Sequence, residues 1–194
     1  MLSLYIMSEN SKNNPKVLIQ LAKEGDPEAF GRLYELYFTP IFRYIYIRVK
    51  DKGISEDLVQ DVFLKIHKSI YGFQEKGKDP LAYFFTIARN TVIDFWKKKK
   101  DLIADDPTEV FDKLKDESAN PIDFAERRET EKAVRQAIGK LSDDRQDVII
   151  LKFIEGFSNR EIAKMLGKSE ESVRQLQCRA LRNLRAHLKD FKVL

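Results

Sequence analysis

Apolar residues recur at spacings of three and four along almost the whole chain, and no stretch convincingly alternates apolar and polar residues as a β-strand does. This helical period constrains the fold most. Successive residues of an α-helix turn by about 100°, and each apolar stripe must be buried against another helix. Eight glycines and six prolines in 194 residues leave few breaks between helices. The sequence therefore predicts an all-α protein.

The helical period fades between residues 101 and 125, where eight acidic and two basic residues occur. Because the net charge of the whole chain is +4, the segments on either side of this acidic stretch are strongly basic. Basic domains suit a polyanionic partner, although a solvated helical surface gives the same composition. The expected organisation is an N-terminal tail over 1–15, a helical domain over 16–100, an acidic linker over 101–125 and a second helical domain over 126–194.

Metal and membrane functions find little support in the composition. Two histidines and one cysteine give no metal-ligand spacing and no intramolecular disulfide. The chain has no apolar run of about 20 residues, and residues 1–7 lack the basic front of a signal peptide. Paired metal-binding carboxylates, a phosphate-binding glycine loop and a nucleophile motif are also missing, which argues against a nucleic-acid enzyme. We expect no metal, no cofactor, no catalytic residue, no membrane insertion and a cytoplasmic location.

Capping and helix-breaking residues predict where the helices of the first domain begin and end. Gly53 breaks the chain, and Ser55 is placed to cap the helix that follows. Pro40 should kink or restart the preceding helix, because proline lacks the backbone N–H. Residues 72–80 form a loop, after which a further helix runs to about residue 100.

The helix after Ser55 has two contrasting faces. Its apolar side is the predicted core stripe and consists of Val59, Val62, Phe63, Ile66 and Ile70. Its opposite side is acidic and polar around one leucine, and includes Asp57, Gln60, Asp61 and Leu64. Such a face fits a docking surface for another helix, but a solitary exposed leucine is also common.

The next helix combines aromatic and basic residues outside its core stripe. These residues include Arg89, Asn90, Trp96 and the lysines at 97–100. Aromatic rings stack on unpaired bases while lysines contact phosphates, so this side suits opened DNA strands. A basic last turn that complements the helix dipole, with the aromatics in the core, explains the same residues.

Residues 141–188 carry the strongest signal of function. Ser158 and Glu161 form a capping box, Gly167 makes a turn, and Ser169 caps a longer second helix. The outward side of that second helix carries Glu171, Arg174, Gln175, Cys178, Arg179 and Arg182. Arginine and glutamine suit base edges, and arginine also binds phosphate. The pattern favours a DNA-binding helix-turn-helix over a helical hairpin with a solvated basic face.

Several segments resemble, in the right order, one family of bacterial proteins, the extracytoplasmic-function (ECF) sigma factors of RNA polymerase. Residues 22–26 (AKEGD) and 57–63 (DLVQDVF) look like the family's polymerase-binding domain. Residues 87–90 (IARN) resemble the promoter-melting helix. The helix-turn-helix resembles the domain that reads the upstream promoter element, through residues 156–158 (GFS), 161–163 (EIA) and 172–174 (SVR). The resemblance leaves no segment for the additional regions of larger sigma factors.

The resemblance implies a role for each surface. Asp57, Gln60, Asp61 and Leu64 would face the clamp helices of the polymerase's largest subunit. Contacts to the minus-ten element would come from Phe73, Lys76, Lys78, Arg89, Asn90, Trp96 and Lys97. Contacts to the minus-thirty-five element would come from Ser158, Arg160, Glu171, Arg174, Gln175, Cys178, Arg179 and Arg182. The acidic linker would follow the RNA exit path, and an anti-sigma factor would be a further partner.

Two departures limit what the resemblance transfers. Many family members carry a serine-arginine pair where Gln175 and Leu176 stand, and an aromatic residue or histidine where Cys178 stands. The promoter sequence is therefore not transferred. The alternative function is a helix-turn-helix regulator that acts without the polymerase. Such a regulator would need a ligand pocket or dimerisation helices in its first domain, and would have no use for residues 57–63.

Overall fold

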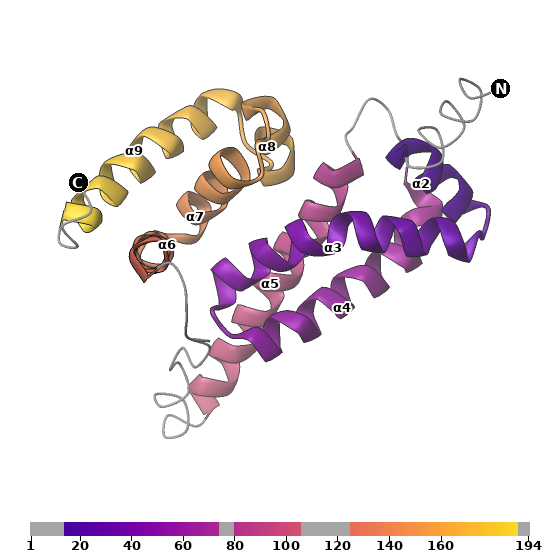
Figure 1. Cartoon of the computed structure of the whole chain (residues 1–194), viewed down its shortest axis with the longest axis horizontal. Coiled ribbons are helices and arrows are strands. Elements are labelled where there is room, and N and C mark those ends of the chain that lie inside the picture. The colour runs from indigo at the N-terminus through magenta and orange to yellow at the C-terminus, as the bar shows by residue number, and fades with distance from the viewer. Residues whose placement is uncertain (1–13, 74–79, 106–124, 190–194) are drawn as a thin grey trace. The chain divides into compact units, whose positions relative to one another are not determined.

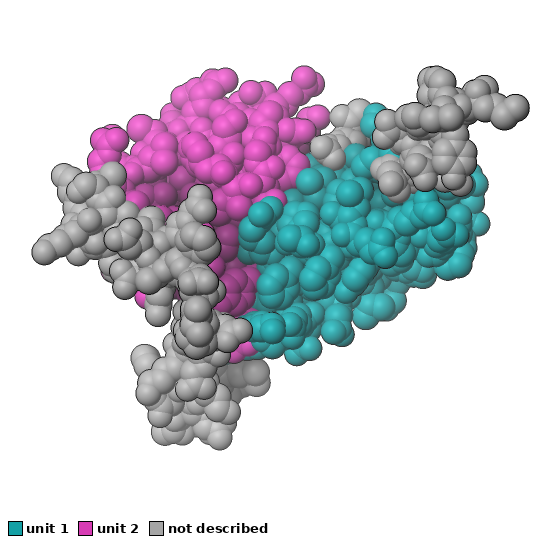
Figure 2. All heavy atoms as spheres, in the orientation of Figure 1, with its two compact units in different colours: residues 1–45, 52–99 teal, residues 46–51, 100–194 magenta. Residues whose placement is uncertain are grey.

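The computed structural model describes residues 14–73, 80–105 and 125–189 (Figure 1). Over these ranges the chain forms helices joined by short turns and contains no strand. The all-α prediction is therefore confirmed. The chain divides into two compact units, one of Met1–Ile45 with Lys52–Lys99 and one of Tyr46–Asp51 with Lys100–Leu194 (Figure 2). The limits expected for the acidic linker remain a prediction, because residues 106–124 lie outside the described ranges.

The described residues of the first half form four α-helices and one 3₁₀ turn. They are α2 (Pro15–Lys23), α3 (Pro27–Val49), α4 (Lys52–Ser69), the 3₁₀ turn Ile70–Gly72 and α5 (Pro80–Asp105). Asp26 caps α3, because its Oδ1 accepts hydrogen bonds from the backbone N–H groups of Glu28 (2.8 Å) and Ala29 (3.2 Å). Pro27 then occupies the first helical position, where its missing N–H costs nothing.

Buried side chains of α3, α4 and α5 form the core of the first unit. The predicted stripe of α4 is buried as expected, and it meets α3 and α5 through aromatic contacts. Tyr34 of α3 lies 4.5 Å from Phe63 of α4 between ring centroids, and Tyr37 meets Phe84 of α5 edge to face at 4.8 Å. The side chains that complete this core include Leu33, Ile41, Ile45, Phe85, Ala88 and Val92.

Two boundary predictions for α3 and α4 are wrong. The chain turns at Lys50, whose φ of 62° is left-handed, and α4 begins at Lys52. Gly53 therefore lies in the first turn of α4, and Ser55 is buried inside the helix instead of capping it. Of the two outcomes expected at Pro40, a kink or a restart, the restart does not occur, because α3 continues through that residue to Val49. Tertiary burial of the α3 residues after the proline outweighs the local cost of its missing hydrogen bond.

The helices of the second half are α6 (Ala125–Gly139), α7 (Asp143–Ile149), a π-helical turn (Ile150–Ile154), α8 (Asn159–Leu166) and α9 (Glu170–Lys189). The longest of them, α9, packs against α6, α7 and α8. The buried apolar side chains between these helices include Ile138, Val148, Leu151, Ile162, Val173 and Ala180. This core holds one side of α9 and leaves its other side exposed.

Candidate nucleic-acid interface

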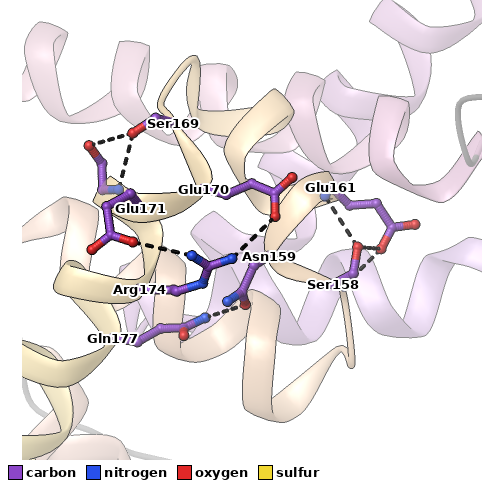
Figure 3. Close-up of polar contacts among 9 residues, drawn as sticks. Ser158, Asn159, Glu161, Ser169, Glu170, Glu171, Arg174 and Gln177 are labelled. Atoms are coloured by element: carbon purple, nitrogen blue, oxygen red, sulfur yellow. Dashed lines mark hydrogen bonds and ion pairs between the residues drawn. The ribbon is translucent and has the colours of Figure 1, made fainter.

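Local hydrogen bonds fix where α8 and α9 begin (Figure 3). The Ser158 backbone N–H donates to Glu161 Oε2 at 2.8 Å, and the Glu161 N–H donates to Ser158 Oγ at 3.3 Å. This capping box fixes the start of α8 as the sequence predicted. Gly167 ends α8 with a left-handed φ of 63°, which glycine adopts without strain. Ser169 then caps α9 by accepting from the Ser172 N–H at 3.1 Å.

One side of α9 is exposed over its whole described length. Val173 and Ala180 point into the core and are fully buried, while the opposite side is in solvent. We call this exposed side the α9 stripe, and it consists of Glu171, Arg174, Gln175, Cys178, Arg179 and Arg182. All of these side chains were expected to point outward, and the structure exposes each of them. Arg185 extends the stripe by one turn, and the sequence analysis missed it although it lies three residues after Arg182.

The first two turns of α9 also carry acidic side chains that pair with Arg174 (Figure 3). Arg174 Nη1 lies 3.2 Å from Glu171 Oε2, and Arg174 Nη2 lies 3.8 Å from Glu170 Oε2. Gln175 Nε2 is 3.5 Å from the other carboxylate oxygen of Glu171. These groups are exposed, and exposed ion pairs typically contribute about 0–1 kcal/mol. The pairs therefore orient Arg174 without fixing it in place.

A hydrogen bond connects α8 and α9 directly. Gln177 Nε2 donates to Asn159 Oδ1 at 2.8 Å, and the contact is partly buried (Figure 3). It sets the rotation of α9 about its own axis relative to the first turn of α8. The sequence analysis missed this contact. The position of Gln177 beside the core stripe marked it as a boundary residue, but nothing local identified Asn159 as its partner.

At the start of α8, Ser158 and Arg160 are both exposed. The backbone N–H groups of this first turn carry the positive end of the helix dipole, which favours a phosphate group. Both residues were expected at the DNA interface. The structure brings them into the same compact unit as the α9 stripe.

The acidic side of α4 is exposed as predicted. Asp57, Gln60, Asp61 and Leu64, which we call the α4 face, are all exposed, and Leu64 is 59% exposed. The leucine is not solitary. His67 and Tyr71 are exposed and follow Leu64 at spacings of three and four residues, and the His67 ring lies 6.5 Å from Tyr71 and 4.9 Å from the half-buried Phe30, centroid to centroid. Sequence reasoning missed His67 and Tyr71, and their position favours a docking surface over a stray leucine.

The outer side of α5 leaves its aromatic and basic residues exposed or half-buried. Asn90 and Lys97 are exposed, whereas Arg89 and Trp96 are half-buried. Lys99 Nζ lies 5.4 Å from the centroid of the Trp96 ring, so a cation covers that ring in the free protein. This arrangement disagrees with the interpretation that Trp96 is simply a core residue.

The loop over residues 72–80, which carries three of the residues expected at the minus-ten element, is described only at its ends. Phe73 is buried, its ring lies 4.6 Å from Tyr83, and its carbonyl oxygen accepts a hydrogen bond from Lys23 Nζ at 3.0 Å. A base could reach the Phe73 ring only if the ring were first exposed. Lys76 and Lys78 lie outside the described residues. The contacts of all three residues with the minus-ten element therefore remain predictions.

Two absences can be stated for the described residues. No helix among them is both long enough and apolar enough to cross a membrane. No three side chains of histidine, cysteine, aspartate or glutamate in those ranges lie together as a metal site would require.

Both halves of the chain match known families. Residues 33–101 match Sigma-70 region 2, and residues 131–184 match Sigma-70 region 4. The chain is 35% identical to the ECF RNA polymerase sigma factor BldN of Streptomyces coelicolor, in an alignment that covers 89% of this chain but 65% of BldN. It is 32% identical to the ECF RNA polymerase sigma factor SigX of Bacillus subtilis, over 83% of this chain and 84% of SigX.

Solved structures of similar fold agree with this assignment. CnrH, solved in complex with the cytosolic domain of CnrY, is 24% identical with a TM-score of 0.68, over 90% of this chain and 96% of CnrH. RpoE of Bartonella quintana, solved with the anti-sigma factor NepR, is 23% identical with a TM-score of 0.70, over 82% of this chain and 96% of RpoE. At these identities the likeness concerns the fold. The fold and the exposed helix-turn-helix agree with the two matching regions and the sequence relatives. These matches show that this chain belongs to the ECF sigma factors of RNA polymerase.

Proposed function

We propose that this chain binds core RNA polymerase, directs it to specific promoters and assists strand separation when transcription starts. The observation that carries the proposal is that one chain exposes both the α4 face and the α9 stripe. A regulator that acts without the polymerase needs the second surface but has no use for the first. The family assignment points to the same activity.

The α4 face is proposed to dock on the clamp helices of the polymerase's largest subunit. Leu64 supplies an apolar centre, and Asp57, Gln60 and Asp61 surround it with acidic and polar groups. Interfaces are commonly built with such a centre and rim, in which apolar burial supplies affinity and charge supplies specificity. The rings of His67 and Tyr71 enlarge the apolar part of the surface.

The outer side of α5 is proposed to hold the minus-ten element as its strands separate. Flipping a base out of the stack costs a few kcal/mol, which stacking surfaces and cations must offset. Trp96 offers a ring, and Arg89, Asn90 and Lys97 offer donors beside it. The proposal also includes the residues of the preceding loop, which are Phe73, Lys76 and Lys78.

The α9 stripe is proposed to enter the major groove of the minus-thirty-five element. An α-helix fits that groove, and its outward arginine and glutamine side chains match base edges. Ser158 and Arg160, at the start of α8, would contact phosphates next to the groove. Because α9 is held by its buried side, these contacts need no rearrangement of the helix-turn-helix.

We further propose that the protein works by binding alone, in the bacterial cytoplasm, without a cofactor or a metal ion. An anti-sigma factor is a proposed partner. The solved structure of RpoE contains one, and the α4 face and the α9 stripe are both exposed here and open to such a partner. A protein that covers either surface would prevent the contacts proposed above.

Reconstitution with core polymerase tests this function. The purified full chain is mixed with core enzyme, and run-off transcription is measured on a library of genomic fragments. Defined start sites that appear only when the chain is added are the expected result. No binding to core enzyme, or no new start site on any fragment, would reject the proposal. Specific binding to duplex DNA without binding to core enzyme would favour the regulator instead.

A further inference from the structure

The start of α9 places two glutamates beside Arg174, the first arginine of the α9 stripe. Glu171 Oε2 lies 3.2 Å from Arg174 Nη1 and forms a hydrogen-bonded ion pair with it (Figure 3). Glu170 is more distant, since its Oε2 lies 3.8 Å from Arg174 Nη2. The 3.5 Å contact between Glu171 and Gln175 is at the limit of a hydrogen bond, so the inference rests on Arg174.

The chemistry of arginine allows it to hold a base and a carboxylate together. A guanidinium group has five N–H donors, and a bidentate contact with guanine O6 and N7 uses two of them. Arg174 can therefore keep its bond to Glu171 while it contacts a base. A carboxylate in that position also weakens the attraction of Arg174 to phosphates, because its negative charge partly neutralises the guanidinium and repels a second anion.

We propose that Glu171 determines specificity by acting through Arg174: it positions the guanidinium toward a base edge and reduces its attraction to phosphates at any sequence. In this role Glu171 is a positioning residue that does not itself touch the base. The inference rests on the proposed function, because it requires α9 to read duplex DNA.

The relative strengths of the competing contacts support this role. Arg174 and Glu171 are 58% and 64% exposed, and an exposed pair shifts an equilibrium by up to about fivefold. A bidentate contact with the correct base discriminates by about 5- to 150-fold, so such a contact outweighs the pair. The free energy of a single phosphate contact of Arg174 exceeds that of the Glu171 pair by much less. The pair therefore lowers the affinity for wrong sequences more than the affinity for the right one.

The test compares matched charge changes in the holoenzyme. Wild-type holoenzyme first selects its preferred upstream duplex from a randomised library. The dissociation constants of wild type, Glu171→Gln and Glu170→Gln are then measured on the selected and a scrambled upstream duplex. Both variants remove one negative charge from the same helical turn. We expect Glu171→Gln to lower the discrimination ratio by about two- to fivefold, and Glu170→Gln to raise affinity for both duplexes while the ratio changes less than about twofold.

A second pair of variants separates positioning from direct base contact. In an Arg174→Ala background, Glu171→Gln should leave the discrimination ratio unchanged, since the residue through which it acts is gone. An equal fall in that background would overturn the inference, because Glu171 would then contact the base itself. An unchanged ratio in the single variant, or an equal fall with Glu170→Gln, would also overturn it. If wild-type holoenzyme selects no sequence, the proposed function fails instead.

Discussion

Removing the apolar centre of the α4 face should weaken polymerase binding by a predictable amount. Leu64 is 59% exposed in the free protein, and complete burial of a leucine side chain contributes about 1.5–3 kcal/mol. If docking covers the exposed part, Leu64→Ala should lose about 0.9 to 1.8 kcal/mol of binding free energy, which is about 5- to 20-fold in Kd. Alanine is a strong helix former, so α4 should remain intact.

The assay is a fluorescence titration of labelled protein with core polymerase, accompanied by thermal unfolding of the free protein. Leu36→Ala is the matched control, because Leu36 is also an exposed leucine on a helix of the same unit, at 45% exposure, and is not part of the α4 face. The control should bind as wild type does. Wild-type affinity of Leu64→Ala would refute the reasoning, and so would an equal loss with Leu36→Ala.

Four further changes test the remaining surfaces. Asp61→Arg should weaken binding to core polymerase in the same titration because it reverses a charge on the α4 face, whereas Glu131→Arg, an equal change at an exposed residue of α6, should not. Replacing the four lysines at 97–100 with serine should slow promoter opening, which permanganate reactivity measures, and should flatten the salt dependence of binding. An unchanged salt slope would contradict a phosphate contact by these lysines. Arg179→Ala should lose about 1–3 kcal/mol of affinity on the preferred upstream element, and an equal loss on all sequences would make it a phosphate contact. Gln177→Leu should lower the free energy of unfolding by about 0.5–1.5 kcal/mol because it removes the hydrogen bond to Asn159, and an unchanged denaturation midpoint would disagree.

Local features of the sequence predicted local structure well. The capping box of Ser158 and the left-handed turn at Gly167 need only residues within a few positions, and both occur as expected. The α4 core stripe follows from the helical period alone. These features depend on backbone geometry and burial, which short segments specify by themselves.

Features that depend on distant residues were not predictable from the sequence. Ser55 has the chemistry of a helix cap but lies buried in α4, because packing against the other helices decides where that helix begins. The bond between Asn159 and Gln177 joins residues 18 positions apart, and the grouping of His67 with Phe30 spans two helices. Predicting each of these features requires the tertiary structure, which helix propensity and periodicity do not specify.

The capping box of α8 has a thermodynamic consequence for the holoenzyme. The box closes with hydrogen bonds of 2.8 and 3.3 Å within the chain itself, and the left-handed glycine completes the turn without any ligand. The turn that leads into α9 is therefore ordered before the protein meets a promoter, and association need not supply the entropy of folding it. The free energy of each correct base contact is therefore available to discriminate between promoters.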